Sequence, residues 1–123
     1  MVCTQAQPKR SAFIAVIYGE SMQYELRTYT LSDEASAETY FRVHWERHIG
    51  SLSKYGIGVD HVFLNKANHQ VIAICTYPDG SDIQAADEAY MHSPEFHSDM
   101  EGFPMDSIVS VEPCIVESAD FLK

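Results

Sequence analysis

Two histidines, His44 and His48, lie four residues apart in a segment with helical periodicity. At about 100° per residue both rings fall on one side of the helix, with His48 near its middle. The same side carries apolar and aromatic residues: Ala37, Phe41, Trp45, Leu52 and Tyr55. An imidazole exchanges a proton near pH 7, so His48, and next His44, are candidate acid/base catalysts in a pocket. The alternative is that both rings are structural and bond to neighbouring strands.

The same spacing would also allow a shared metal ion. Residues 44–48 read His-Trp-Glu-Arg-His, which superficially resembles the zinc-protease motif HExxH. The glutamate is displaced by one residue and falls on the outer side of the helix, so the protease interpretation fails on geometry. A two-histidine site would need a third ligand, for which His61 is the one obvious candidate. We therefore expect no metal site.

Three polar side chains share one face of a predicted strand over residues 24–31. Glu25, Arg27 and Tyr29 alternate with the residues of the other face. Directed at a pocket, Arg27 and Tyr29 would stabilise a developing oxyanion and Glu25 would contact the substrate. Directed away from the helices, the three would form a ladder of ion pairs at a subunit interface. Alternation predicts that they point together, and it leaves both directions open.

Other aromatic and polar residues are candidates for the wall of a substrate pocket. His61 and Phe63 share one face of the second predicted strand, and Tyr77 ends the third, where its hydroxyl would donate at a pocket mouth. Trp45, the sole tryptophan, and Phe41 would supply flat apolar walls. The alternative for each of them is ordinary packing in the core or at an interface.

The elements that would position these side chains follow the order β-α-β-β-α-β. Helices are predicted over residues 34–55 and 83–92, with a short helix after Pro94. Strands are predicted over residues 24–31, 59–65, 70–77 and 107–118. This order is typical of an α+β, ferredoxin-like fold, an antiparallel sheet with both helices on one face. The central strands are apolar on both faces, so we expect a second copy on the open face, which makes a homodimer.

Length and charge restrict the function further. The 123 residues fit one domain, over residues 23–118, between an N-terminal arm or extra strand (1–22, with a strand at 12–18) and a tail (119–123). Acidic side chains outnumber basic ones 18 to 8, and a formal charge of −10 disfavours nucleic acid and anionic membranes as partners. No stretch approaches the roughly 20 apolar residues of a membrane span. Three cysteines without a CxxC pair favour a reducing compartment, and hence the cytoplasm.

Several of these segments together resemble the NIPSNAP family. They are YELRTYTL at residues 24–31, the long helix with His48, the strand that ends in Thr76-Tyr77, and Ser93-Pro94-Glu95-Phe96. The resemblance covers about residues 23–117, and ELRTY is its most specific part. It implies a dimeric α+β barrel with a small-molecule pocket between each sheet and its helices. Members of that superfamily include cofactor-independent monooxygenases, polyketide cyclases, lactone isomerases and haem-binding enzymes.

The sequence and the resemblance together lead to one functional hypothesis. We expect a pocket for an apolar, oxygen-bearing organic molecule and proton-transfer chemistry without a cofactor, which means isomerisation, cyclisation or oxygenation. His48 would be the acid or base, and Arg27 with Tyr29, or Tyr77, would hold the oxyanion. The alternative is a non-catalytic ligand-binding or protein-interaction protein with structural histidines. Haem binding through a helix histidine has less support.

Overall fold

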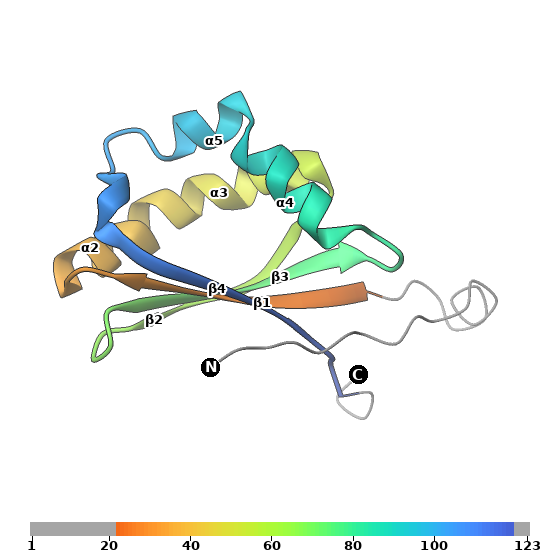
Figure 1. Ribbon diagram of the computed structural model, residues 1–123, viewed down its shortest axis with the longest axis horizontal. Helices are drawn as coiled ribbons and strands as arrows, with labels where there is room; N and C mark the ends of the chain where they lie inside the picture. The colour runs from red at the N-terminus through yellow and green to blue at the C-terminus, as the bar shows by residue number, and fades with distance from the viewer. Residues whose placement is uncertain (1–21, 120–123) are drawn as a thin grey trace.

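The chain forms one antiparallel sheet with all its helices on one face (Figure 1). A computed structural model describes residues 22–119; the predicted arm and its strand over residues 12–18 lie outside them. The strands are β1 (Met22–Leu31), β2 (Gly58–Asn65), β3 (Gln70–Pro78) and β4 (Ile108–Val116). Their order in the sheet is β2-β3-β1-β4, with β1 paired antiparallel to both β3 and β4. The predicted ferredoxin-like fold is therefore confirmed.

Two helical segments cover one face of the sheet. The first connects β1 to β2 and comprises α2 (Glu34–Thr39), a π-helical segment η1 (Tyr40–His44), α3 (Trp45–Leu52) and η2 (Ser53–Tyr55). The second connects β3 to β4 and comprises α4 (Ile83–Met91), α5 (Pro94–Asp99) and η3 (Met105–Ser107). No helix within residues 22–119 is long and apolar enough to cross a membrane.

Local sequence signals set the ends of these helices. Asp33 caps α2 by accepting a hydrogen bond from the Ser36 amide at 2.7 Å. Gly56 ends the first helical segment with a positive φ of 76°. The cap of α4 is Asp82, which accepts from the Ala85 amide at 3.1 Å; Ser81, the residue that a capping-box pattern favours, does not make this bond.

The π-helical segment η1 changes which aromatic side chain enters the core. A π-turn holds more residues than an α-turn, so each residue advances the helix by a smaller angle. Residues upstream of His44 are therefore rotated relative to a regular helix. Tyr40 becomes buried, whereas Phe41 is only partly buried at the edge of the core. Phe41, which the sequence suggests as an apolar wall of the pocket, therefore lies at the edge of the core.

The burial of β1 side chains and the contact of Arg27 with Asp87 of α4 settle which residues of β1 face the helices. Glu25 and Tyr29 are buried on the helix side with Arg27 between them, which excludes the ladder at an interface that the sequence had left open. On β3, the same face carries Val71, Ala73, Cys75 and Tyr77, all at most 1 % exposed. The opposite face of the sheet carries Leu26, Ile72 and Ile74, which are half-buried.

A change of register in β2 moves two predicted site residues away from the helices. The pairing of β2 with β3 shifts between Val59 and His61. Val62 and Leu64 then pack against the core, while His61 and Phe63 lie on the opposite face with their rings stacked at 5.4 Å. Phe63 is 48 % exposed. His61 and Phe63 share one strand face, as predicted, but it is the face of the sheet opposite the helices.

Candidate functional site

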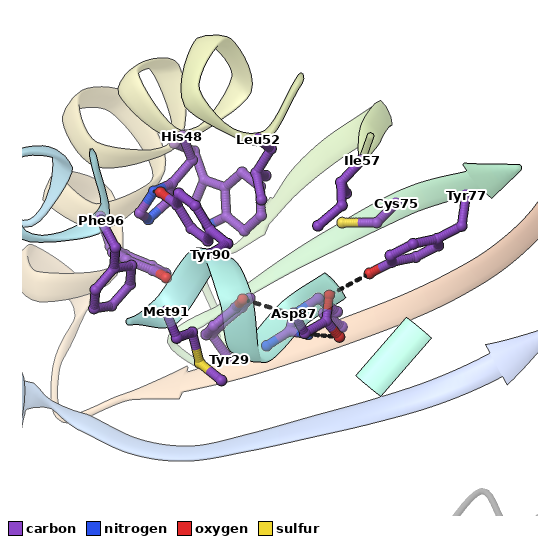
Figure 2. A pocket seen from close by; sticks show the side chains of 13 residues that line it. Tyr29, His48, Leu52, Ile57, Cys75, Tyr77, Asp87, Tyr90, Met91 and Phe96 are labelled. Atoms are coloured by element: carbon purple, nitrogen blue, oxygen red, sulfur yellow. Dashed lines mark hydrogen bonds and ion pairs between the residues drawn. The ribbon is translucent and has the colours of Figure 1, made fainter. Parts of the chain in front are cut away.

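A hollow lies between the helices and the sheet face that they cover (Figure 2). The hollow is partly open to solvent, and the space in it available to the centre of a water molecule is about 40 Å³. Its lining comes from β1, β3, η1, α3, α4 and α5, and from Ile57 just before β2. Five of the predicted site residues line it: Arg27, Tyr29, Trp45, His48 and Tyr77. The hollow has two polar regions, one around His48 and one around Arg27.

His48, on α3, is surrounded by aromatic rings. The rings of Trp45 and Tyr40 meet it edge-on, at 5.0 Å and 5.9 Å, and Phe96 stacks parallel to it at 6.1 Å. The side chain is 2 % exposed. Burial lowers the pKa of His48 to about 4, against the opposing effect of the Asp99 carboxylate. The imidazole is therefore neutral at pH 7.

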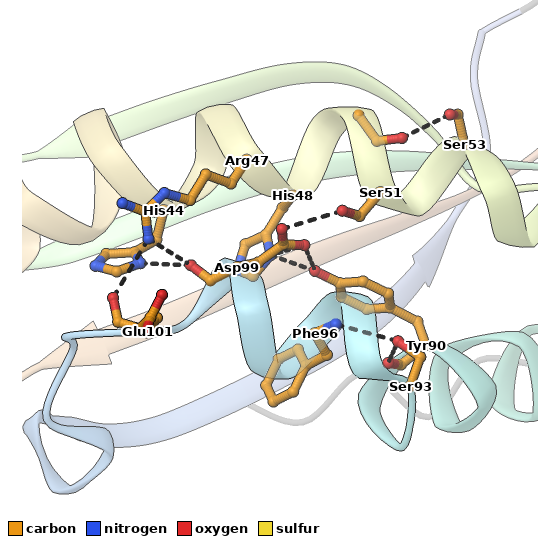
Figure 3. A network of polar contacts seen from close by, with 11 residues as sticks. His44, Arg47, His48, Ser51, Ser53, Tyr90, Ser93, Phe96, Asp99 and Glu101 are labelled. Carbon is orange, nitrogen blue, oxygen red and sulfur yellow. Dashed lines mark hydrogen bonds and ion pairs between the residues drawn. The ribbon is translucent and has the colours of Figure 1, made fainter.

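A buried carboxylate behind His48 orients the ring (Figure 3). The Tyr90 hydroxyl donates to Asp99 at 2.5 Å and is also hydrogen-bonded to Nδ1 of His48. Ser51 donates to the other Asp99 oxygen at 3.0 Å. Because the Tyr90 proton is directed at the carboxylate, the network assigns the proton of the neutral ring to Nδ1. Nε2 then carries the free lone pair, and it takes no part in the hydrogen bonds of His48 within residues 22–119.

The second polar region is built around the Arg27 guanidinium. Its Nη1 contacts Glu25 at 3.0 Å and Asp87 at 2.9 Å, and its Nε donates to the Tyr29 hydroxyl at 2.8 Å. Burial alone would lower the pKa of Arg27, but Tyr29, Asp87 and Glu25 together hold it above its usual value. Arg27 is thus permanently charged and already paired with two carboxyl groups.

Tyr77 joins the same two carboxyl groups from β3. Its hydroxyl lies 2.6 Å from Asp87 Oδ1 and 2.9 Å from Glu25 Oε1, and burial raises its pKa well above the usual value. Burial also raises the pKa of Asp87 to about 6, with a further contribution from Glu25 and opposing contributions from Tyr77 and Arg27. The nearby Cys75 thiol has a pKa raised by burial to about 12, so it is no thiolate nucleophile.

Trp45 contributes the one buried side-chain polar atom without a hydrogen-bond partner among residues 22–119. Its indole Nε1 has no acceptor, although the side chain is only 2 % exposed and lines the hollow. Buried N–H groups without a partner are rare in folded proteins and cost about 1–3 kcal/mol. An oxygen atom of a bound molecule would supply the missing acceptor.

The remaining predicted residues do not line this hollow. His44 is buried, but its Nδ1 is bonded to the backbone oxygen of Asp99 at 2.8 Å and its ring packs on Phe103, which fits the structural alternative. Phe41 lies at the edge of the core, and His61 and Phe63 lie on the other sheet face. Glu25 contacts lining residues without lining the hollow itself. Within residues 22–119, no group of three or more His, Cys, Asp or Glu side chains is arranged to hold a metal.

Sequence reasoning missed Tyr40, Asp87, Tyr90 and Asp99. The inward position of Tyr90 on α4 follows from helical periodicity, but its bonds depend on how α4 and α5 pack against α3. Asp87 is one of two adjacent acidic residues on α4, and composition does not distinguish it from the exposed Glu88. Its position one helical turn before Tyr90 and Met91 is the signal that could have found it.

Comparison with known proteins identifies the fold. Neither a protein-family profile nor a curated protein sequence matches the chain. Solved structures do. A NIPSNAP family protein from Agrobacterium tumefaciens has a TM-score of 0.65 and 18 % identity, over 82 % of this chain and 96 % of that one.

Two further solved structures give the same result. An uncharacterized NIPSNAP domain protein from Burkholderia xenovorans has a TM-score of 0.63 and 16 % identity, over 80 % and 96 % of the two chains. A Caulobacter crescentus protein, provisionally described as an antibiotic biosynthesis monooxygenase, has a TM-score of 0.56 and 11 % identity, over 88 % and 99 %. The chain therefore has the ferredoxin-like α+β fold of the NIPSNAP proteins, which it shares with monooxygenase-type structures.

Proposed function

We propose that this protein binds a small, apolar, oxygen-bearing organic molecule in the hollow and moves a proton on it without a bound cofactor. The chemistry would be isomerisation, cyclisation or oxygenation of an enolisable substrate. His48 is the acid/base group. The observation that carries the proposal is a neutral, buried imidazole that lines the hollow, with Nδ1 held by Tyr90 and Nε2 free.

The arrangement around His48 suits a proton acceptor. Asp99 lies 3.5 Å from Nδ1, so a proton that arrives at Nε2 creates an imidazolium whose charge the carboxylate stabilises. The low pKa keeps the ring neutral in the absence of a ligand, so the lone pair of Nε2 is unprotonated across the neutral pH range. Ser51 holds the carboxylate in place from α3 itself.

Tyr29 is the best-placed donor for a developing oxyanion. Its hydroxyl oxygen accepts from Arg27 Nε, which leaves the hydroxyl proton available for an atom in the hollow. Arg27 contributes indirectly, because Glu25 and Asp87 already neutralise its charge. The predicted direct role of Arg27 therefore becomes a positioning role, and Tyr77 likewise serves the two carboxyl groups.

We further propose that the protein acts as a homodimer. Leu26, Ile72 and Ile74 form an apolar surface on the sheet face that helices leave uncovered, and Phe63 extends it. A second copy related by a twofold axis would bury this surface. Cys75 is a buried, protonated thiol, whereas Cys114 is disulfide-bonded, so the cysteines do not support the expected cytoplasmic location.

The proposal is tested by proton exchange, which needs no knowledge of the natural substrate. The probe is 2-tetralone, an apolar ketone with acidic α-protons, in D₂O. We expect the full chain to accelerate exchange of the α-protons, followed by NMR, and His48→Gln to abolish the acceleration. Gln keeps a hydrogen-bonding group near Tyr90 but does not accept a proton. His92→Gln, at an exposed residue at the end of α4, is the matched control.

The alternative function, ligand binding without catalysis, predicts a different result. The probe would then shift the NMR signals of hollow residues without faster exchange, and His48→Gln would bind it as the wild type does. Equal exchange rates in the wild type and in His48→Gln would contradict the catalytic proposal. Mass spectrometry of any molecule that co-purifies with the chain would identify the natural ligand class.

A further inference from the structure

The polar end of the hollow opposite His48 contains more acceptors than its protons can satisfy. Glu25 and Asp87 both contact Arg27 Nη1, and both contact the Tyr77 hydroxyl. The two hydrogens of Nη1 supply one bond to each carboxyl group. The Tyr77 hydroxyl has a single proton, which cannot form a full hydrogen bond to both Asp87 Oδ1 and Glu25 Oε1. With both acids ionised, one short contact is therefore without a proton.

Charge leads to the same conclusion. Two carboxylates next to one guanidinium leave a net negative charge, while Glu25 is 4 % exposed and the Asp87 side chain is 15 % exposed. A buried, uncompensated charge is unfavourable, and like charges that share a site cannot both ionise easily. One extra proton removes the excess charge and fills the missing hydrogen bond. Asp87 is the member of the pair whose pKa is raised, through burial and through charge and hydrogen-bonding effects of Glu25.

We propose that Glu25 and Asp87 share one proton across Tyr77 and that Asp87 delivers it to an uncharged oxygen of the ligand in the hollow. Asp87 is the member that lines the hollow, whereas Glu25 lies behind it. The groups that face the pair are Arg27 and Tyr29 from β1 and Tyr77 and Cys75 from β3. Only Arg27 is cationic, and both acids engage it, so a carboxylate ligand finds no free positive charge.

The pair completes the proton-transfer chemistry of the proposed function, on which this use of the proton rests. His48 Nε2 removes a proton from the carbon next to the ligand carbonyl, and the C–H electrons form the C=C bond. The carbonyl π electrons take the shared proton from Asp87, which gives an enol, an imidazolium and two carboxylates. Reversal at another carbon returns both protons and isomerises the ligand. No charge is gained or lost, and no external oxidant is needed.

The shared proton can be measured without any ligand. The full chain, labelled with ¹³C at Asp and Glu carboxyl carbons, is titrated by NMR from pH 3 to pH 9. We expect one carboxyl of the pair to titrate near pH 6. In Asp87→Asn, this titration step near pH 6 should disappear. The matched control, Glu88→Gln on the exposed side of α4, should keep the step unchanged.

The absence of any carboxyl titration step of this pair above about pH 4.5 in the wild type would overturn the shared proton. The wild-type measurement decides this even if Asp87→Asn does not fold. The delivery step is tested by α-proton exchange of 2-tetralone, where we expect at least a tenfold loss in Asp87→Asn and none in Glu88→Gln. If the titration holds but Asp87→Asn exchanges like the wild type, the delivery step is wrong. Loss of exchange in Asp87→Asn with full exchange in His48→Gln would contradict the function and leave the shared proton intact.

Discussion

The hydroxyl group of Tyr90 donates a hydrogen bond of 2.5 Å to the carboxylate of Asp99, and both side chains are buried. This bond joins α4 to the end of α5, and through His48 it joins both to α3. The hydroxyl therefore has a structural role between three helices and a functional role behind the imidazole. The two roles can be separated, because they predict effects on different measurements.

Tyr90→Phe should lower stability and raise the pKa of His48. Removal of the hydroxyl leaves His48 Nδ1 and Asp99 Oδ2 without their shared partner, at a cost of about 1–3 kcal/mol in the free energy of unfolding. The two groups are 3.5 Å apart, so protonated His48 would then pair directly with the carboxylate. Urea unfolding at pH 7 and NMR titration of the His48 ring measure the two effects.

Tyr55→Phe is the control for this substitution. It removes a hydroxyl that donates to Glu95 at 2.7 Å in a partly buried place; the Tyr55 ring packs on Tyr90, but its hydroxyl is bonded to Glu95 and not to His48 or Asp99. We expect a loss of about 1 kcal/mol, as for a typical hydrogen bond, and no change in the His48 titration. Equal effects of the two substitutions on the His48 midpoint would refute the proposed role of Tyr90.

The dependence of stability on pH should contain two opposing contributions. Folding lowers the pKa of His48 from its usual value of 6.5 to about 4. Between these pH values, His48 binds fewer protons in the folded chain than in the unfolded chain, so its contribution to stability is lost as the pH falls. Folding raises the pKa of Asp87 from 3.8 to about 6. Between these pH values, Asp87 binds more protons in the folded chain than in the unfolded chain, so its contribution to stability is lost as the pH rises. Each amounts to about 3 kcal/mol, and together they largely cancel between pH 4 and pH 6.

Single variants should reveal each slope. Relative to the wild type, Asp87→Asn should gain stability with rising pH between 4 and 6, by up to about 3 kcal/mol. His48→Gln should show the opposite trend over the same interval. Urea midpoints at several pH values measure both, and Glu88→Gln should follow the wild-type curve. Parallel curves for all the variants would show that neither group titrates as described.

Trp45 should report directly on occupation of the hollow. It is the sole tryptophan of the chain, and its Nε1 hydrogen has no acceptor within the described residues. Binding of 2-tetralone should therefore shift the single indole N–H signal in the ¹H–¹⁵N spectrum and change the tryptophan emission. A ligand that shifts the signals of Tyr29 and His48 while the indole signal stays fixed would show that Nε1 is not part of the binding surface.

Ile74→Asp should prevent dimer formation without unfolding the chain. Ile74 lies on the outer face of central strand β3, where the proposed twofold contact would bury it. A buried unpaired carboxylate is strongly unfavourable, so sedimentation should show a dimer for the wild type and a monomer for the variant. Val109→Asp, at a 64 % exposed residue of edge strand β4, is the control. A wild-type monomer at micromolar concentration would contradict the proposed dimer.

The fold could be predicted from local signals, because element order, caps and alternation all agree. The periodicity of β1 predicts that Glu25, Arg27 and Tyr29 share a face, and only the packing of α4 against the sheet determines that it is the helix side. In β2, a shift of register reverses the direction that simple counting would give for His61. A period-two pattern does not reveal such a shift.

The site was only partly predictable for a related reason. His48 could be identified because its place in an apolar stripe is a property of one helix. Its partners, Tyr90 and Asp99, come from later elements, and their contacts depend on the angle at which helices pack. Asp87 meets Arg27 across 60 positions of sequence, and no pattern within either segment indicates this contact.

The wide turn at Tyr40–His44 has a consequence for changes in chain length. One residue removed within it, between Tyr40 and His44, would restore regular α-helical winding while Tyr40 and the residues before it, and His48 and the residues after it, kept their orientation. The same deletion between His48 and Leu52 would rotate one of these side chains out of the hollow. Among the positions of the long helix, this turn is therefore where natural variants of this protein can most easily lose a residue.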